Sequence, residues 1–340
     1  MARDTTSINL KVGLLGGGSW GTTVGALVAR NAPITLWARN QATVDDINNN
    51  HHNSRYLGDA VLPPNLQAST SIEATVADAD VVVMGIPSQS FRTVLEEVKQ
   101  HIRPWVPVIS LTKGLELDTS LRMTQIINEV LPGHPVGVLT GPNLAREIMA
   151  GQAAASVLAM TDKVILCELQ KLFKGGLFRV YTNDDVLGCE LGGVLKNIIA
   201  IAVGMGDGQG AGDNTRAALI TRGLAEVTRL GVAMGGRPET FAGLAGMGDM
   251  IATCTSTHSR NRHVGMELGK GRSMQDIANE MFMVAEGAKS APAVIALSEQ
   301  YQVEMPIAVD VYRVISGDST ALRAFKGLLR VDAGAEHEPG

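Results

Sequence analysis

The chain has 340 residues, of which 45% are hydrophobic and 19% are charged, and its formal net charge is −5. This composition excludes global disorder and is sufficient for about two domains with buried cores. Lys and Arg form no basic block that could follow a phosphate backbone. The sequence therefore argues against nucleic-acid binding and favours a small-molecule partner.

The cysteines and histidines show no spacing that would bind a metal. Cys167, Cys189 and Cys254 are far apart, no C-x-x-C pair occurs, and the histidines are scattered. Free cysteines without a disulfide framework are typical of a reducing cytoplasm. We therefore expect a cytoplasmic protein without a bound metal.

The longest uncharged run, residues 12–29, is long enough for a short membrane span. The glycines clustered between Gly16 and Gly21 would break a lipid-exposed helix. Asp4 interrupts the basic start that a secretory signal needs. We expect neither a membrane span nor a signal peptide.

Short β-branched runs alternate with helical stretches through the first half of the chain. The expected strands are residues 11–16, 34–39, 79–87, 107–114 and 136–142. Two further strand-like runs, 155–160 and 178–183, flank a helical stretch at 162–174 and extend the same sheet. This order predicts an α/β fold with a Rossmann-type, doubly wound and mostly parallel sheet.

From about Asp185 the pattern changes to long helical stretches, and strand alternation ends. Helices are expected at residues 191–205, 214–230, 261–269 and 273–281. We predict a Rossmann-type domain at 1–190, an all-helical domain at 191–330, and a polar, disordered tail at 331–340.

A glycine-rich turn follows the first expected strand. In KVGLLGGGSWG, the glycines Gly16, Gly18 and Gly21 form the pattern G-x-G-x-x-G between a strand and a helix. A helix start of this kind can hold a pyrophosphate, although a turn that serves only packing is the alternative. Arg39 ends the second strand, where an NAD site carries an acidic residue. Arg39 would instead meet the 2′-phosphate of NADP, unless it is an ordinary surface arginine.

The stretch 191–205, LGGVLKNIIAIAVGM, is apolar on nearly every side and yet contains Lys196 and Asn197. A helix without a polar face is buried, so Lys196 needs a partner or an anionic ligand. The alternative, a solvated lysine, requires a polar face that this helix lacks.

Further polar residues stand where expected strands end. Lys113 follows one strand directly, and Gly141 and Asn143 follow another. Ligands of open α/β sheets bind at this edge, and glycine permits close approach of a backbone. Each of these positions is a candidate for ligand binding, with an ordinary loop residue as the alternative.

The stretch 243–265, GLAGMGDMIATCTSTHSRNRHVG, places Asp249 in a glycine-rich turn and lets Ser259, Arg260 and Asn261 open a helix. A helix start with an arginine and small polar side chains favours a phosphate. The alternative is a plain helix cap by Ser259 with a solvated Arg260.

These motifs together resemble one family. GGGSWG, TKGLE, TGPNLA, GGVLKNIIAIAVGM, NTRAALITRGLAE, GLAGMGDMIATCTSTHSRN and VAEG stand in the order and spacing of the bacterial NAD(P)-dependent glycerol-3-phosphate dehydrogenases, from about residue 11 to 325. The resemblance implies a cytoplasmic enzyme that uses NADP or NAD and no metal. Its substrate pair would be dihydroxyacetone phosphate and sn-glycerol 3-phosphate, for phospholipid synthesis. It also implies a homodimer.

The resemblance also implies roles for matching positions. Lys196 matches the catalytic proton donor or acceptor. The matching substrate-binding positions are Lys113, Gly141, Asn143, Lys196, Asp249, Ser259, Arg260 and Asn261. The matching cofactor contacts are Gly16, Gly18, Ser19, Trp20, Gly21, Arg39, Tyr56, Lys113, Ala145, Arg260, Val284 and Glu286.

Three positions depart from the family pattern. Asn143 stands where serine or threonine is commoner, but it can still bond a substrate hydroxyl. Asn40 stands where a second basic residue often follows Arg39, which weakens the prediction of a strong NADP preference. Gly17 replaces the usual alanine, and we expect no effect from this change.

In the implied mechanism, the substrate ketone accepts a hydride from the nicotinamide and a proton from Lys196. Asn197 and Asp249 would orient Lys196 and the substrate hydroxyls, and Arg260, aided by Asn261, would hold the phosphate. Two alternatives stay open. One is another dehydrogenase with a Rossmann and a helical domain, of the 3-hydroxy acid or 6-phosphogluconate type. The other is a non-catalytic redox sensor that binds NADPH.

Overall fold

The computed structural model describes residues 10–281 and 285–328 and divides the chain into two compact units. The first unit comprises the chain up to Thr112 and residues 123–186, and the second comprises Lys113–Arg122 and the chain from Leu187 on. Residues 1–190 were predicted to form one domain, whereas Lys113–Arg122 belongs with the helical unit. The expected tail at 331–340 lies outside the described residues.

The first unit is built on an eight-stranded sheet with the order β3-β2-β1-β4-β5-β6-β7-β8. The strands are β1 (Val12–Leu15), β2 (Ile34–Trp37), β3 (Leu66–Ser69), β4 (Val81–Met84), β5 (Val108–Ser110), β6 (Val136–Thr140), β7 (Ala154–Met160) and β8 (Phe178–Asn183). All neighbouring strands run parallel except β6 and β7, which pair antiparallel. The prediction of a mostly parallel Rossmann-type sheet is confirmed.

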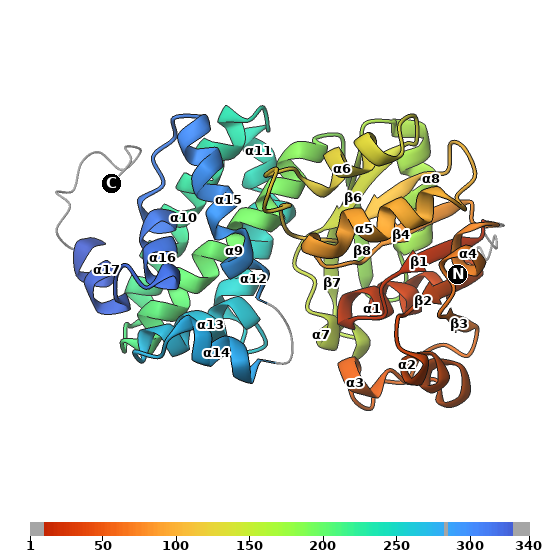
Figure 1. Cartoon of the computed structure of the whole chain (residues 1–340), viewed down its shortest axis with the longest axis horizontal. Helices are drawn as coiled ribbons and strands as arrows, with labels where there is room; N and C mark the ends of the chain where they lie inside the picture. The colour runs from red at the N-terminus through yellow and green to blue at the C-terminus, as the bar shows by residue number, and fades with distance from the viewer. Residues whose placement is uncertain (1–9, 282–284, 329–340) are drawn as a thin grey trace. The chain divides into compact units, whose positions relative to one another are not determined.

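Helices alternate with these strands and pack against them (Figure 1). They are α1 (Ser19–Val28), α2 (Gln41–Asp45), a π-helical turn (Asp46–Asn50), α3 (Ser54–Leu57), α4 (Ile72–Val76), α5 (Ser88–Lys99), α6 (Met123–Val130), α7 (Ala145–Met149) and α8 (Lys163–Phe173). The central strands β1 and β4 are fully buried, which explains their continuous apolar sequence. The strand β3 was not predicted, because its sequence LQAS has no β-branched residue and it lies at the partly exposed sheet edge.

The second unit is a bundle of helices around α9 (Val186–Gly208) (Figure 1). The other helices are α10 (Asp213–Ala233), α11 (Pro238–Phe241), a π-helical turn (Leu244–Gly248), α12 (Asp249–Thr255), α13 (Arg260–Gly269), α14 (Met274–Glu280), α15 (Glu286–Gln300), α16 (Pro306–Ser316) and α17 (Ala321–Leu328). The prediction that residues 191–205 form a buried helix is confirmed, and the helix continues beyond both expected ends.

Burial also distinguishes α9 from a membrane helix. Among the described residues it is the one helix that is long and apolar enough to cross a membrane, and 89% of its most apolar window is buried inside the protein. Such burial is typical of the core helix of a globular domain. The run at residues 12–29, considered above as a membrane span, forms β1, the glycine turn and α1.

Glycines bring α13 and α15 into direct backbone contact with α9. A Cβ at Gly204 of α9 would lie 2.1 Å from the carbonyl oxygen of Arg262, and one at Gly265 of α13 would lie 2.1 Å from that of Ile201. At the start of α15, a Cβ at Gly287 would lie 2.8 Å from the carbonyl oxygen of Asn197. Because no side chain separates these backbones, the starts of α13 and α15 are held close to the middle of α9.

Candidate functional site

The glycine turn of the first unit has the geometry of a dinucleotide-binding loop. Gly16 has a φ of +125°, and a Cβ there would lie 2.4 Å from the carbonyl oxygen of Gly85. A Cβ at Gly21 would lie 2.0 Å from the carbonyl oxygen of Gly16. Gly18, which caps α1, has open space where its Cβ would be. Gly16 and Gly21 are required by the turn, and Gly18 leaves the start of α1 open to a pyrophosphate.

Three of the predicted cofactor contacts gather beside this turn. Ser19 begins α1, and its Oγ donates a hydrogen bond of 3.3 Å to the carbonyl oxygen of Tyr56. Trp20 packs against Phe178, with ring centroids 6.5 Å apart. The buried Nε1 of Trp20 has no hydrogen-bond partner within the described part of the chain. An unsatisfied buried donor of this kind fits a polar ligand at the turn.

Arg39 stands just beyond β2, and its side chain is exposed. The next residue, Asn40, caps α2, because its Oδ1 accepts a hydrogen bond of 2.8 Å from the backbone N–H of Ala42. The fold therefore uses Asn40, the residue after Arg39, as a helix cap. Arg39 alone remains as the basic side chain at this strand end.

The carboxyl end of β6 carries the next group of predicted residues. Gly141 has a φ of +133°, a conformation that only glycine adopts readily. The Oδ1 of Asn143 accepts a short hydrogen bond from the Oγ of Ser156, which lies on β7. The buried Nδ2 of Asn143 has no partner among the residues that the structure describes. Ala145 begins α7 two residues later. Asn143 thus presents a fixed donor that a ligand oxygen could satisfy.

In the second unit, one carboxylate binds two lysines. The Nζ of Lys196, a side chain that is 5% exposed, lies 3.0 Å from the Oδ1 of Asp249. The Nζ of Lys113 lies 2.6 Å from the other oxygen, Oδ2. Lys196 also donates a short hydrogen bond to the Oγ1 of Thr253, and that hydroxyl lies 2.7 Å from the carbonyl oxygen of Asp249. The prediction that Lys196 needs a partner is confirmed, and the partner is Asp249.

Asp249 is the first residue of α12, so the expectation that it lies in a glycine-rich turn was wrong. The glycines before it form the π-helical turn Leu244–Gly248, which runs directly into α12. The helical spacing explains why Thr253 joins the cluster, since residues four apart share one helix face. Thr253 was not among the predicted site residues, and its i, i+4 relation to Asp249 is the sequence signal that points to it.

Burial and charge give Lys196 an unusual proton affinity. Burial, the largest effect, lowers the pKa of Lys196 to about 8, while Asp249 acts to raise it and the positive charge of Lys113 acts to lower it. Cys254 also acts on Lys196, but burial raises the pKa of its own thiol to about 12, so it stays neutral. Lys196 can therefore gain and lose a proton near neutral pH, as an acid–base group requires.

Asn197 has a different partner from the one expected. Its Oδ1 accepts a hydrogen bond of 2.9 Å from the Nδ2 of Asn261, and the Oδ1 of Asn261 accepts one of 3.0 Å from the backbone N–H of Gly287. The expectation that Asn197 orients Lys196 finds no support in these contacts. Asn197 instead orients Asn261, and the pair ties α9 to the starts of α13 and α15.

The start of α13 was predicted correctly. Ser259 caps it, with its Oγ accepting from the backbone N–H of Arg262 at 3.3 Å, and Arg260 is the first residue of the helix. Arg260 is an exposed residue, but burial around its guanidinium, the larger effect, lowers its pKa, while the charge of Glu286, the first residue of α15, acts to raise it. The predicted cofactor contact Val284 lies outside the described residues. An N-cap and an exposed arginine at one helix start can together bind a phosphate.

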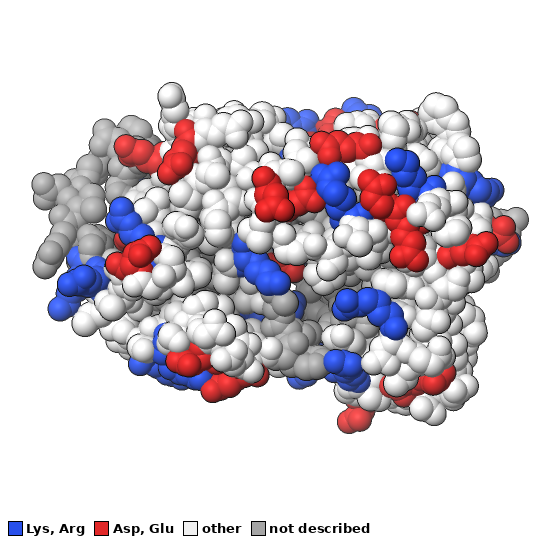
Figure 2. All heavy atoms as spheres, in the orientation of Figure 1, with Lys and Arg blue, Asp and Glu red and all other residues white. Residues whose placement is uncertain are grey.

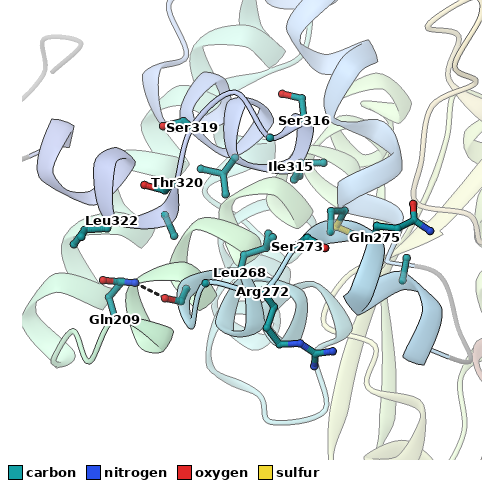
Figure 3. A pocket seen from close by; sticks show the side chains of 17 residues that line it. Gln209, Leu268, Arg272, Ser273, Gln275, Ile315, Ser316, Ser319, Thr320 and Leu322 are labelled. Carbon is teal, nitrogen blue, oxygen red and sulfur yellow. Dashed lines mark hydrogen bonds between the residues drawn. The ribbon is translucent and has the colours of Figure 1, made fainter.

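The second unit also has a hollow that is separate from these groups of residues. A hollow of about 600 Å³ opens in the second unit and is lined by residues including Gln209, Ser273 and Thr320 (Figure 3). It contains none of the predicted site residues.

Within the described ranges, no group of three or more His, Cys, Asp or Glu side chains is arranged to hold a metal ion. On the face shown in Figure 2, acidic and basic side chains are interspersed.

A dinucleotide turn in one unit and a buried acid–base lysine in the other are typical of a nicotinamide-dependent dehydrogenase. Comparison with known proteins is more specific. Residues 11–165 match the N-terminal part, and residues 185–326 the C-terminal part, of the family described as NAD-dependent glycerol-3-phosphate dehydrogenase. The chain therefore belongs to the NAD-dependent glycerol-3-phosphate dehydrogenase family, whose members use NAD or NADP.

Individual relatives agree with this assignment. The chain is 69% identical to glycerol-3-phosphate dehydrogenase (NAD(P)+) 2 of Sphingopyxis alaskensis, over 98% of this chain and all of the relative. It is 55% identical to the enzyme of Mycobacterium avium, over 96% of each chain. The crystal structure of glycerol-3-phosphate dehydrogenase from Coxiella burnetii superposes with a TM-score of 0.90 at 35% identity, covering 95% of this chain and 99% of that one.

Proposed function

We propose that the chain catalyses the reversible reduction of dihydroxyacetone phosphate to sn-glycerol 3-phosphate with NADPH or NADH. The single observation that carries this proposal is the buried cluster of Lys196, Asp249 and Lys113 in a member of this family. When bound, the reduced cofactor supplies the hydride that the ketone carbon accepts. All other steps are assigned to side chains of this chain.

Lys196 is the proposed acid and base. In the reduction, the ketone oxygen gains negative charge as its carbon is reduced, and the protonated Nζ of Lys196 gives it a proton. In the reverse reaction, the neutral amine removes the hydroxyl proton. The low pKa of Lys196 supports both roles, because the two protonation states are close in free energy near pH 8. Asp249 holds the amine in position, and Lys113 adds a second positive charge that favours the developing oxyanion.

The substrate phosphate is assigned to the start of α13. Ser259 caps this helix, Arg260 is exposed at its first turn, and Asn261 is oriented by Asn197 and Gly287. A phosphate held at such a point provides binding energy far from the reacting carbon, and this energy positions the carbon. In the first unit, family resemblance supports the assignment of Gly141 and Asn143 to the substrate, and for Asn143 the buried Nδ2 without a partner among the described residues supports it further.

The cofactor is assigned to the first unit. The start of α1 at Gly18 would hold the pyrophosphate, with Gly16, Ser19, Trp20, Gly21, Tyr56 and Ala145 around it. Arg39 would meet a 2′-phosphate, and the absence of a second basic residue beside it supports the use of both NADPH and NADH. The assignments of Glu286 and Val284 to the cofactor rest on family resemblance.

A cytoplasmic homodimer that supplies glycerol 3-phosphate for phospholipid synthesis completes the proposal, and family resemblance supports these points. Two rival functions are less well supported. A dehydrogenase of the 3-hydroxy acid or 6-phosphogluconate type would carry other motifs around its lysine. A non-catalytic NADPH sensor would not need Lys196, Asp249 and Arg260 together.

The decisive experiment follows the oxidation of NADPH, and separately of NADH, when dihydroxyacetone phosphate is added to the purified protein. Rapid oxidation is expected with at least one of them. The Lys196→Met variant should lose turnover and still bind NADPH. The Arg260→Ala variant should raise KM and also lower kcat, because a lost phosphate contact misplaces the carbon. If the unmodified protein binds NADPH but does not oxidise it with dihydroxyacetone phosphate, the rival functions are favoured. Reduction of NADP+ with 6-phosphogluconate or a 3-hydroxy acid would then identify another dehydrogenase, and no reduction with either would favour the sensor.

A further inference from the structure

The segment Lys113–Arg122 leaves the sheet after β5 and belongs to the helical unit. It contains no helix, and an isolated antiparallel bridge joins Leu115 to Arg122. The backbone N–H of Glu116 donates a hydrogen bond of 3.0 Å to the carbonyl oxygen of Leu121 inside this bridge. Within the same segment the backbone N–H of Ser120 donates to the carbonyl oxygen of Glu116, and the Oγ1 of Thr119 donates to the Oε2 of Glu116. Because this irregular segment lies outside any helix or sheet, the contacts that join it to the helices help to fix the position of Lys113.

Leu115 and Arg122, besides Lys113 itself, join the segment to the helices. Leu115 is fully buried in the hydrophobic core formed around α9. Arg122, at the other end of the bridge, lies with its Nη1 2.8 Å from the Oε2 of Glu190, a residue of α9. The side chain of Glu190 is 0% exposed and that of Arg122 is 12% exposed. The bridge and the ion pair therefore connect Lys113 to the same helix that carries Lys196.

Stability alone does not explain a buried ion pair at this place. Removing two charges from water costs so much that an apolar pair of similar size often gives equal or greater stability. What such a pair provides is a fixed geometry, since a buried charge without its partner is strongly unfavourable. Here the ion pair fixes the position of the segment that carries Lys113, and Lys113 binds the carboxylate of Asp249.

We propose that Arg122 and Glu190 are positioning residues, which hold Lys113 against Asp249 during the reduction of the ketone. This inference rests on the proposed function, because it assigns a role within that reaction. Arg122 acts through the bridge to Leu115, and Leu115 lies two residues from Lys113. Neither Arg122 nor Glu190 touches the substrate in this account, so neither is a catalytic residue.

The proposal makes the effect of Arg122 depend on Lys113. If Arg122 acts only through Lys113, then Arg122→Met should lower kcat/KM for dihydroxyacetone phosphate by about 10- to 100-fold, as a misplaced group does. In a Lys113→Met background, the same substitution should cause no further loss. Arg122→Lys should restore part of the activity. Arg92→Met, which breaks an exposed arginine–glutamate pair of 3.0 Å in the first unit, should leave kcat/KM unchanged.

A second readout concerns the pH dependence. Lys113 contributes to the lowered pKa of Lys196, so its withdrawal should raise that pKa. The fall of kcat/KM at alkaline pH should then shift to higher pH in Arg122→Met, in the same direction as in Lys113→Met. The titratable groups that act on Lys196 are Asp249, Lys113 and Cys254, and only Lys113 is displaced in this account. A general loss of stability would not shift the pH at which kcat/KM falls.

Arg122→Met leaves the carboxylate of Glu190 buried without its arginine and could prevent folding. The double variant Arg122→Met/Glu190→Met removes both charges, and it should fold and show the same loss and the same pH shift. A folded double variant with unchanged kcat/KM and an unchanged pH limb would overturn the proposal. So would an equal loss from Arg122→Met with and without Lys113.

The unmodified protein separates failure of this proposal from failure of the proposed function. If it does not reduce dihydroxyacetone phosphate, the proposed function is wrong. The pKa of Lys196 is then measured from the 13Cε chemical shift of labelled lysine. The Lys196→Arg variant identifies the signal of Lys196. A higher pKa in the Arg122→Met/Glu190→Met variant would still support the positioning of Lys113. An unchanged pKa would reject it.

Discussion

Lys196 and Asp249 form a buried ion pair, with the Nζ of Lys196 3.0 Å from the Oδ1 of Asp249 and both side chains at most 5% exposed. The same carboxylate binds Lys113 through its other oxygen. Two ammonium groups and one carboxylate leave a net positive charge in this cluster, which suits an oxyanion. Asp249 is the group that allows two lysines to lie so close together, because their charges would otherwise repel each other.

Replacing Asp249 by Asn should therefore damage catalysis more than binding. Asn keeps the shape but removes the charge that raises the pKa of Lys196. That pKa should fall further, less of the protonated lysine should be present at pH 7, and kcat for ketone reduction should drop by roughly 10²- to 10⁴-fold. Steady-state kinetics with dihydroxyacetone phosphate measure this loss.

The control for this variant is Asp213→Asn, which removes an exposed carboxylate from the first turn of α10. It should leave kcat within about twofold, since a surface ion pair contributes little. The assigned role of Asp249 would be refuted by an Asp249→Asn protein that folds and reduces the ketone at the normal rate.

The pKa of Lys196, about 8, should be visible in the pH dependence of both reaction directions. Ketone reduction needs the protonated amine, so kcat/KM for dihydroxyacetone phosphate should fall as the pH rises through about 8. Oxidation of glycerol 3-phosphate needs the neutral amine, so its kcat/KM should rise through the same pH. Measuring both directions between pH 6 and 10 tests the assignment. Parallel pH profiles in the two directions would contradict it.

Arg39 should affect the choice of cofactor and not the chemistry. An arginine binds a phosphate strongly and a ribose hydroxyl weakly, so Arg39→Ala should lower the ratio of kcat/KM for NADPH to that for NADH by about tenfold or more. Arg179, exposed on β8, offers the matched control, and Arg179→Ala should leave the ratio unchanged. Equal losses with both cofactors after Arg39→Ala would mean that Arg39 does not meet the 2′-phosphate.

Local patterns predicted much of this structure. The glycine turn, the order of strands and the apolar circumference of α9 are all encoded in neighbouring residues, and the last of these correctly required a partner for Lys196. Which residue becomes that partner depends on how α12 packs beside α9. A single sequence does not state this packing, so Asp249 was assigned only through family resemblance.

Two of the differences from the sequence predictions have the same physical origin. Lys113–Arg122 joins the helical unit through Leu115 in its core and through the pair of Arg122 and Glu190, whose members are 68 residues apart in sequence. Asn197 was expected to orient its neighbour Lys196, but a helix points adjacent side chains in different directions, and Asn197 instead meets Asn261. Contacts between distant elements decide both cases.

Glu226 offers a prediction about stability that is independent of the function. This residue of α10 is 2% exposed, and its carboxylate accepts hydrogen bonds from the backbone N–H groups of Ile307, at 2.8 Å, and Ala308, at 3.3 Å. These are first-turn groups of α16, and the N-cap residue of α16, Met305, makes no side-chain hydrogen bond. Glu226→Ala should leave two buried donors unsatisfied and lower the free energy of unfolding by about 2–4 kcal/mol.

The protonation of Glu226 adds a pH dependence whose sign can be stated. Burial raises the pKa of Glu226 to about 7, from its ordinary 4.5, against the opposing effects of the two N–H groups and of Arg229 and Arg222. Between these values the folded protein holds a proton that the unfolded chain has released. The free energy of unfolding therefore falls as the pH rises from 4.5 to 7, by at most about 3 kcal/mol from this group. Glu226→Gln cannot titrate, so the difference in urea midpoint between the unmodified protein and this variant should change across that range and be constant above it. A difference that is the same at pH 5 and pH 8 would mean that Glu226 is already ionised in the folded protein at pH 5.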